Sequence, residues 1–232
     1  MWVEPASNNP SDSSRMADAV FRIACERLAV DHAAELAEAV CSQAPGIEKS
    51  AHSGVHPVHV AGTQNGWERP EHANAFLQLS KRTPLRIRVE LSYANELINL
   101  LAGKTLNVGG NTIDVLSGKV RTLSPAATLF SRYLYFPSPD INNCEQAFVN
   151  QVSKECQQYK FSPTKILCGR EHVISTNKGK QLTRSVLLAD VPAVSSVTLQ
   201  EQGLGEGRTM GCGLFIPHKD TGAVNETTGS GL

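Results

Sequence analysis

The residues with the clearest chemical potential form one stretch of glycines and cations late in the chain. Residues 203–219 read GLGEGRTMGCGLFIPHK, with glycines on both sides of Arg208 and an apolar segment that runs into His218 and Lys219. Glycine at this density lets backbone N–H groups come close to a phosphodiester. We therefore predict an RNA-gripping loop, whose contacts are Gly205, Gly207, Gly211, Arg208, His218 and Lys219.

The order of elements around this loop excludes the common mononucleotide sites. Glycine loops of the Rossmann and Walker type follow a strand and open a helix, so that the helix N-terminus meets the phosphate. Here the loop follows a predicted helix at residues 193–202 and leads into a predicted strand at 213–216. This order favours the backbone of a polyanion over a single nucleotide as the ligand.

The elements that must position the loop occur in the same order twice. Hydrophobic periodicity predicts a strand, a helix, two strands, a helix and a strand in each half of the chain. In the first half we expect them at residues 19–28, 31–44, 55–61, 76–89, 93–101 and 105–120, with Asp31 as the cap of the first helix. In the second half we expect them at residues 129–136, 145–159, 165–174, 181–189, 193–202 and 213–216. The pattern predicts an α+β fold of tandem ferredoxin-like (RRM-like) domains.

The two ends of the chain are predicted to lie outside these domains. Residues 1–15 are rich in Ser, Asn, Pro and Asp, and residues 220–232 are small and polar, so neither can bury enough apolar surface to order itself. We expect a disordered extension, an N-terminal domain at 16–123, a C-terminal domain at 124–219 and a flexible tail.

Composition and charge limit the class of protein. The 232 residues carry 22 Lys and Arg against 22 Asp and Glu, which counts against a strongly basic nucleic-acid binder. Bases are concentrated at residues 81–121 and 160–219, however, so that one face could still bind RNA. No apolar run reaches the ~18 residues of a membrane span, and the start lacks the apolar core of a secretory signal. We expect a cytoplasmic protein with no membrane partner.

Two other recognition modes fit the sequence poorly. Only 6% of the residues are aromatic, which argues against the base-stacking pairs of an RNA recognition motif. Cys168 and His172 lie four residues apart on a predicted strand, which separates them by ~13 Å, too far for one zinc ion. We predict no metal site and no cofactor.

Several unlike motifs together resemble one known family. They are VHPVH at 55–59, NGWERP at 65–70, TLFSRY at 128–133, LCGR at 167–170, TRS at 183–185 and GCGLFIPHK at 211–219. With tandem ferredoxin-like domains and a glycine-rich loop before the last strand, the chain resembles the CRISPR repeat-processing endoribonucleases, the sixth CRISPR-associated family. Within that family it is similar to the Myxan-type subgroup.

The resemblance implies a specific substrate and reaction. Such a protein binds the hairpin of a CRISPR repeat transcript, cuts once at its base and stays on the crRNA 3′ hairpin as a subunit of a Cascade-like complex. Its cleavage needs no metal, because the ribose 2′-hydroxyl attacks the scissile phosphate and leaves a 2′,3′-cyclic phosphate and a 5′-hydroxyl. The expected partners are therefore repeat RNA and the backbone and other subunits of that complex.

Histidine suits the proton transfers, since its unperturbed pKa of ~6.5 lets it take and give protons near neutrality. The resemblance places the catalytic histidine late in the first helix or just after it, a window that contains His52, His56 and His59. His56 is the first choice. His56 and His59 point to opposite faces of a strand unless Pro57 makes a bulge. His52 is the alternative, because Lys49 and Ser50 beside it could stabilise a phosphorane.

Other positively charged residues are candidates for phosphate contacts. Arg86 and Arg88 lie on one face of a predicted strand, and Arg69 follows a predicted Asn-Gly turn, although a solvated strand face would explain the first two equally well. His32 is expected to be a solvated residue of the first helical turn. Two rival functions stay open: a non-catalytic crRNA-binding subunit and a protein-docking assembly module.

Overall fold

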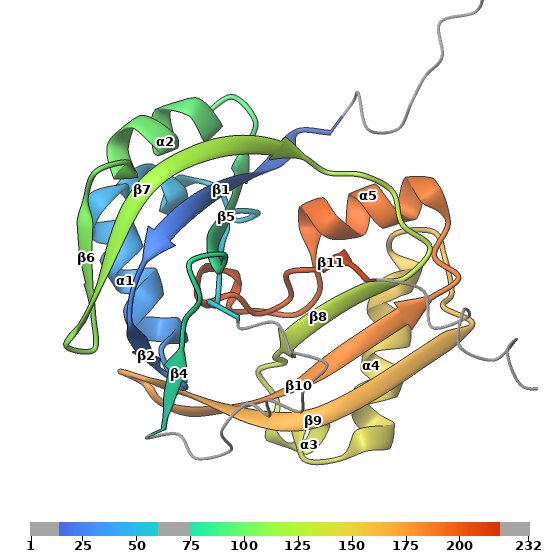
Figure 1. The fold of residues 1–232 in the computed structure, drawn as a ribbon. Coiled ribbons are helices and arrows are strands. Elements are labelled where there is room, and N and C mark those ends of the chain that lie inside the picture. The colour runs from blue at the N-terminus through green and yellow to red at the C-terminus, as the bar shows by residue number, and fades with distance from the viewer. Residues whose placement is uncertain (1–13, 60–74, 219–232) are drawn as a thin grey trace, which may run out of the picture.

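A computed structural model describes residues 14–59 and 75–218 of the chain (Figure 1). The first half contains a five-stranded antiparallel sheet with the strand order β3-β5-β1-β7-β6. Its strands are β1 (Met16–Ala24), β3 (Gly54–His56), β5 (Pro84–Glu90), β6 (Thr105–Val108) and β7 (Asn111–Thr122). Two helices, α1 (Ala33–Gln43) and α2 (Ala94–Leu101), lie on one side of this sheet (Figure 1).

Alternation along the strands explains why the helices cover only one face. Phe21 of β1 and Ile87 of β5 are fully buried in one core with Leu36 of α1 and Leu97 of α2. The residues that alternate with them on the same strands point to the other face, because successive side chains of a strand alternate, and they include charged residues such as Asp18 and Arg86. The first sheet therefore has one apolar, helix-covered face and one helix-free face.

The second half contains a four-stranded antiparallel sheet with the order β11-β8-β10-β9. Its strands are β8 (Leu129–Leu134), β9 (Lys165–Thr176), β10 (Gly179–Ala189) and β11 (Ile216–Pro217). The helices of this half are α3 (Pro139–Asn142), α4 (Glu145–Gln157) and α5 (Ala193–Gln202). Its core joins Leu129 and Val186 of the sheet to Phe148 of α4 and Leu199 of α5.

The remaining elements are short. Strands β2 (Arg27–Ala29) and β4 (Phe76–Gln78) form a two-stranded sheet. Two 3₁₀ turns, η2 (Pro45–Lys49) and η3 (Arg208–Met210), follow α1 and the first glycines of the glycine-rich segment. In Figure 1 the segment with η3 and β11 lies between the two main sheets, next to β3.

The predicted α+β class is confirmed by this architecture. In both sheets the four main strands lie in the spatial order fourth, first, third, second, which is the order of a ferredoxin-like sheet. The predicted domain bounds at 16–123 and 124–219 stay a prediction, and the predicted extension and tail lie almost entirely outside the described residues.

Some predicted boundaries are wrong for identifiable reasons. Asp31 does not cap α1, since the N-cap position is His32 and the Asp31 carboxylate instead accepts from the backbone N–H of Ser175 in β9, at 3.0 Å. Strand β3 ends at His56, before Pro57, which has no N–H to donate to a neighbouring strand. The last strand contains only Ile216–Pro217, because the chain before it turns through glycines with positive φ.

Candidate active site and nucleic-acid interface

The helix-free face of the first sheet carries a cluster of cations. The register pairs Arg22 with Ser117, Arg86 and Lys119 with Val20, and Arg121 with Asp18, so these side chains share one face. Arg22, Lys119 and Arg121 are exposed, and Arg86 is half-buried. We call the four cations Arg22, Arg86, Lys119 and Arg121 the basic face. Such a face can bind the phosphates of RNA.

Only Arg86 of this set was named as an RNA contact from the sequence. The signal for the others was present, because Arg22 has the opposite parity to the buried residues Phe21 and Ile23 of the same strand. Asp18 has that parity too, and it is the acidic residue at the centre of the face. The sequence alone does not show which of the two sets of alternating residues faces solvent, because this depends on where the helices pack.

Asp18 lies between three cationic or titratable groups. Its carboxylate accepts from Nε and Nη2 of Arg88 at 2.9 and 3.3 Å, and it lies 3.7 Å from Nη1 of Arg86. Burial acts to raise the pKa of Asp18, but the charge of Arg88 and the contact with His56 outweigh it and hold the pKa far below its usual value. Asp18 is therefore a permanent anion beneath the basic face.

His56 extends from β3 toward this carboxylate. Its Nε2 lies 3.7 Å from Oδ1 of Asp18, which is an ion-pair distance and too long for a hydrogen bond. The nitrogen is buried and has no hydrogen-bond partner among the described residues. Burial lowers the pKa of His56 to about 4, although Asp18 acts in the opposite direction. The ring is thus neutral at pH 7, with its side chain 13% exposed.

His52 has the opposite environment. It lies in the turn between η2 and β3, which Ser53 closes by donating its backbone N–H to the carbonyl of Ser50 at 3.1 Å. Its side chain is exposed. Its carbonyl accepts from Nε and Nη2 of Arg208 at 3.2 and 2.7 Å. An accessible imidazole is therefore attached to a backbone that is held in place.

His59 turns away from both. It follows β3 and is exposed, and its Nε2 contacts the guanidinium of Arg132 in β8. Because a guanidinium can only donate, His59 accepts with the lone pair that a general base would need. The structure thus separates the three candidate histidines: one enclosed next to Asp18, one exposed on a fixed turn, and one joined to the second half.

Two arginines predicted to contact RNA are instead buried. Arg88 is 0% exposed, and besides Asp18 its Nη1 donates to the carbonyls of Gln200 and Phe215 at 2.6 and 2.8 Å. Arg208 is 9% exposed and donates to main-chain carbonyls, including that of His52. The donors of both side chains are used inside the protein, so their predicted contact with phosphate gains no support from this arrangement.

The glycine-rich segment also faces inward. The N–H of Gly205 donates to the carboxylate of Glu155 at 2.9 Å, and that of Gly211 donates to the carbonyl of Arg208 at 2.8 Å. Gly211 has a φ of 87°, and a side chain there would collide with Pro57. Gly207 has a φ of 81° at the start of η3. The N–H groups of Gly205 and Gly211 that were predicted to meet phosphate are therefore occupied.

The other predicted residues are scattered. His218 is exposed after β11, and its ring lies 5.8 Å from that of Phe130 in β8. His32 is 1% exposed rather than solvated: its Nδ1–H donates to the carbonyl of Ala29 at 2.7 Å and its Nε2 accepts from the N–H of Val58 at 3.0 Å. Arg69 and Lys219 lie outside the described residues.

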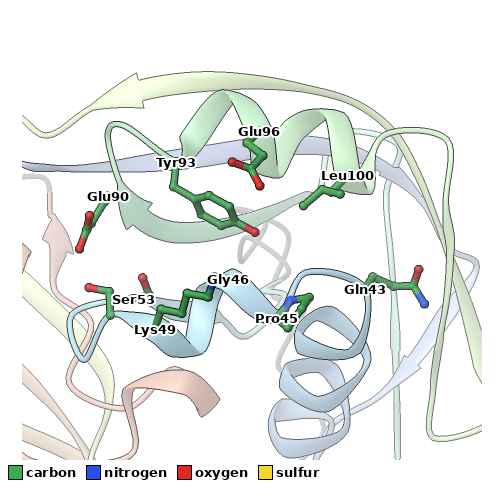
Figure 2. A pocket seen from close by; sticks show the side chains of 10 residues that line it. Gln43, Pro45, Gly46, Lys49, Ser53, Glu90, Tyr93, Glu96 and Leu100 are labelled. Atoms are coloured by element: carbon green, nitrogen blue, oxygen red, sulfur yellow. The ribbon is translucent and has the colours of Figure 1, made fainter.

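A pocket of about 470 Å³ lies between η2 and α2 (Figure 2). Lys49 and Ser50 line it, and Glu90, Tyr93 and Glu96 line it from β5 and α2. Two carboxylates disfavour a phosphate in this pocket. The prediction that Lys49 and Ser50 assist a phosphorane near His52 gains no support from this arrangement.

Two searches bear on other classes of site. Among residues 14–59 and 75–218, no group of three or more His, Cys, Asp or Glu side chains is arranged to hold a metal ion. Within the same residues, no helix has the length and apolarity to cross a membrane.

Comparison with known proteins gives a consistent result. A model of the Cas6 CRISPR family matches residues 17–220. A CRISPR-associated endonuclease Cas6 from Myxococcus xanthus (strain DK1622) is 26% identical over 200 residues, which cover 86% of this chain and 80% of that relative.

Solved structures resemble the fold at low sequence identity. A CRISPR associated protein Cas6 has a TM-score of 0.55 at 12% identity, covering 89% of this chain and 100% of the other. The product of a Cas6-related gene from Pyrococcus furiosus has a TM-score of 0.52 at 11% identity, over 88% and 99% of the two chains. Thermus thermophilus Cse3, bound to an RNA that represents a pre-cleavage complex, has a TM-score of 0.50 at 10% identity, over 87% and 98%.

Proposed function

The chain belongs to the Cas6 family of CRISPR-associated proteins, and from this membership we propose that it is an endoribonuclease that cleaves the repeat hairpin of a CRISPR transcript. The Myxococcus relative carries the name of an endonuclease, and the Thermus structure of similar fold contains RNA. The observation that carries the proposal is the exposed imidazole of His52, on a fixed turn at the start of the edge strand that pairs with β5 of the basic face.

In the proposed reaction the basic face binds the phosphates that flank the cut. A base removes the proton of the ribose 2′-hydroxyl, the 2′-oxygen forms a bond to the adjacent phosphorus, and the bond from phosphorus to the 5′-oxygen breaks. That oxygen leaves as a 5′-hydroxyl after it receives a proton, and the other fragment keeps a 2′,3′-cyclic phosphate. The nucleophile belongs to the substrate, so the proposed mechanism uses no metal.

We assign the proton transfer to His52 rather than to His56. An imidazole with a pKa of about 4 is a weak base at pH 7, and it is protonated too rarely to act as an acid. His59 already accepts from Arg132. His52 is the exposed alternative, and its carbonyl contact leaves the ring nitrogens out of the bond to Arg208.

Cleavage of the cognate repeat RNA in EDTA tests the reaction and the residue together. We expect the wild-type protein to cut once and to leave a 2′,3′-cyclic phosphate. RNA with a single 2′-deoxyribose at the scissile position should bind and stay intact. His52→Ala should bind RNA but cut about 10²- to 10⁴-fold more slowly, whereas His56→Ala and His59→Ala should keep most of the activity.

The same experiment separates the rival functions. A wild-type protein that holds the hairpin without cutting it would be an RNA-binding subunit, and one whose RNA affinity does not change with salt would be a protein-docking module. A need for added magnesium would end the proposed mechanism. Loss of cutting in His56→Ala with normal cutting in His52→Ala would return the assignment to His56.

Two further proposals concern the whole protein. Each half is a ferredoxin-like domain, divided near residues 123 and 124, and the repeated strand order of the two sheets supports this. After cleavage the protein stays on the crRNA 3′ hairpin as part of a Cascade-like complex in the cytoplasm, where its substrate is transcribed. Co-purification of the crRNA with the other subunits tests the second proposal.

A further inference from the structure

Arg208 lies in the glycine-rich segment, yet its guanidinium points into the protein. Besides the two bonds to the carbonyl of His52, Nη2 donates to the carbonyl of Glu201 at 2.8 Å and Nη1 to that of Gly213 at 3.4 Å. These acceptors come from both halves of the protein. Arg208 therefore ties the His52 turn to the end of α5 and to the chain before β11.

Two glycines make room for this arrangement. A side chain at Gly203 would collide with the guanidinium of Arg208, and a side chain at Gly54 would collide with the backbone carbonyl of Arg208. Gly54 directly follows the His52 turn, so the first half packs tightly against Arg208 at this point. We call Arg208, together with the three carbonyls that accept from it, the clamp, and these two glycines leave space for it.

A lysine could not replace this arginine. The planar guanidinium has five N–H donors in a fixed geometry, and here it reaches three carbonyls in different directions, whereas an ammonium is a single compact group. Burial and the nearby charge of Arg88 lower the pKa of Arg208 to about 9, which still leaves the side chain protonated at pH 7. All of its donors are therefore available to the clamp.

Arg88 provides a matched comparison within the same structure. It also inserts between the halves, and it donates to the carbonyls of Gln200 and Phe215, close to those that Arg208 uses. Its other partner is Asp18, and no bond joins it to the described atoms of His52. The two arginines share a task in joining the halves, and only Arg208 holds the His52 turn.

We infer that Arg208 is a positioning residue for the proposed cleavage, which fixes the backbone of His52 so that its exposed imidazole meets the scissile nucleotide in one orientation. The inference rests on the proposed function. It gives the arginine of the glycine-rich segment a role in holding the active site together, rather than in binding the RNA backbone. A displacement of about 1 Å at a reacting group can lower a rate about 10²-fold. Fixing the carbonyl of His52 can therefore have a large effect on the cleavage rate.

The test compares Arg208→Lys with wild type and with Arg88→Lys, using cognate repeat RNA at saturating protein under single-turnover conditions. We expect Arg208→Lys to fold and to bind RNA within about twofold of wild type, with the same dependence on salt, and to cut about 10- to 100-fold more slowly. Arg88→Lys should lower the melting temperature, but it should reduce the cutting rate far less than Arg208→Lys does, because it leaves the His52 turn in place.

A rescue measurement separates positioning from general damage. Arg208→Ala leaves a space of the size of the guanidinium. Millimolar methylguanidinium should raise the cutting rate of this variant several-fold, whereas sodium chloride at equal ionic strength should not. Methylguanidinium should not rescue His52→Ala, which retains the clamp but lacks the imidazole.

Several outcomes would overturn the inference. If Arg208 contacts phosphate, its substitution weakens binding and makes the salt dependence less steep by about one charge, with normal cutting at saturation. Equal losses of cutting in Arg208→Lys and Arg88→Lys, or failure of Arg208→Lys to fold, would assign Arg208 to the fold alone. If the wild-type protein does not cut, the proposed function fails; if it cuts and Arg208→Lys cuts equally fast, only the inference fails.

Discussion

At the scale of single residues, the two histidines near β3 differ in what their surroundings permit. His56 is enclosed between Asp18 and Arg86, and it is neutral at neutral pH because burial disfavours the imidazolium. His52 is exposed and its backbone is fixed. The sequence alone ranked His56 ahead of His52, and their burial differs in the opposite sense. A histidine whose ring nitrogen is buried next to a carboxylate is suited to a structural role in the sheet.

The low pKa of His56 predicts how stability depends on pH. In the unfolded chain the imidazole binds a proton near pH 6.5, and in the folded protein only near pH 4. Between these values the unfolded state holds more protons, so acidification favours unfolding and stability is lost as the pH falls from 6.5 to 4. The total loss from this group is up to about 3 kcal/mol.

The measurement is urea unfolding of wild type and His56→Asn at several pH values. We expect the difference in unfolding free energy between the two proteins to shrink or reverse in favour of the variant as the solution becomes more acidic, because the variant has no imidazole to protonate at this position. Parallel stability curves for the two proteins across this range would contradict the burial of His56 next to Asp18.

At the scale of elements, the glycine-rich segment is a packing device between the two sheets. Gly211 adopts a left-handed conformation and lies against Pro57 and the carbonyl of Val55, so the segment contacts the end of β3 directly. The segment can approach this closely because it has no side chain there. Strand β11, which follows this segment, is short because the chain reaches the edge of the second sheet only at Ile216.

This packing predicts a difference between two glycines of the same backbone conformation. Gly211 and Gly110 have φ of 87° and 77°, but only a side chain at Gly211 would meet other atoms within 4 Å. Gly110→Ala should reduce the unfolding free energy by about 1–2 kcal/mol, the strain of a left-handed alanine. Gly211→Ala should reduce it by about 1–3 kcal/mol more, because of the collision with Pro57. Urea unfolding measures both, and equal losses would show that the contact is not needed.

The elements themselves were largely predictable from sequence, and their long-range partners were not. The spacing of apolar residues in β1, α2, α4 and α5 depends on local periodicity, so most strands and all helices except the short α3 were found within a few residues of their observed bounds. The inward direction of Arg208 depends on the carbonyl of His52, 156 residues earlier in the chain. No local pattern encodes such a contact. A glycine-rich segment with an arginine therefore has the same sequence signature whether it binds phosphate or packs inside.

At the scale of the whole molecule, the helix-free face of the first sheet is the most suitable surface for RNA. The net charge of zero hides it, because Arg22, Lys119 and Arg121 are balanced by acids elsewhere in the chain. This face turns toward the second half, since Arg88 on it reaches the carbonyls of Gln200 and Phe215 (Figure 1). RNA on the basic face would thus lie near both halves.

A charge-matched pair of variants tests this surface. Replacing Arg22, Lys119 and Arg121 by glutamine should weaken binding of repeat RNA at least about tenfold and reduce the steepness of its salt dependence by about two charges or more, because exposed cations release counterions on binding. Replacing the exposed lysines Lys104, Lys154 and Lys178 by glutamine changes the net charge equally but lies on the α2–β6 turn, on α4 and on the β9–β10 turn. Filter binding at several salt concentrations compares them, and equal losses would contradict a localised RNA surface.

The contact between Arg208 and His52 also has a consequence during synthesis of the protein. A ribosome completes the His52 turn long before it adds Arg208, so the first sheet can fold while the turn still lacks its clamp. On the proposed function, a nascent chain cannot cut efficiently until the second half has emerged and folded against the first. Nuclease activity would thus be delayed until Arg208 has left the ribosome and reached the His52 turn.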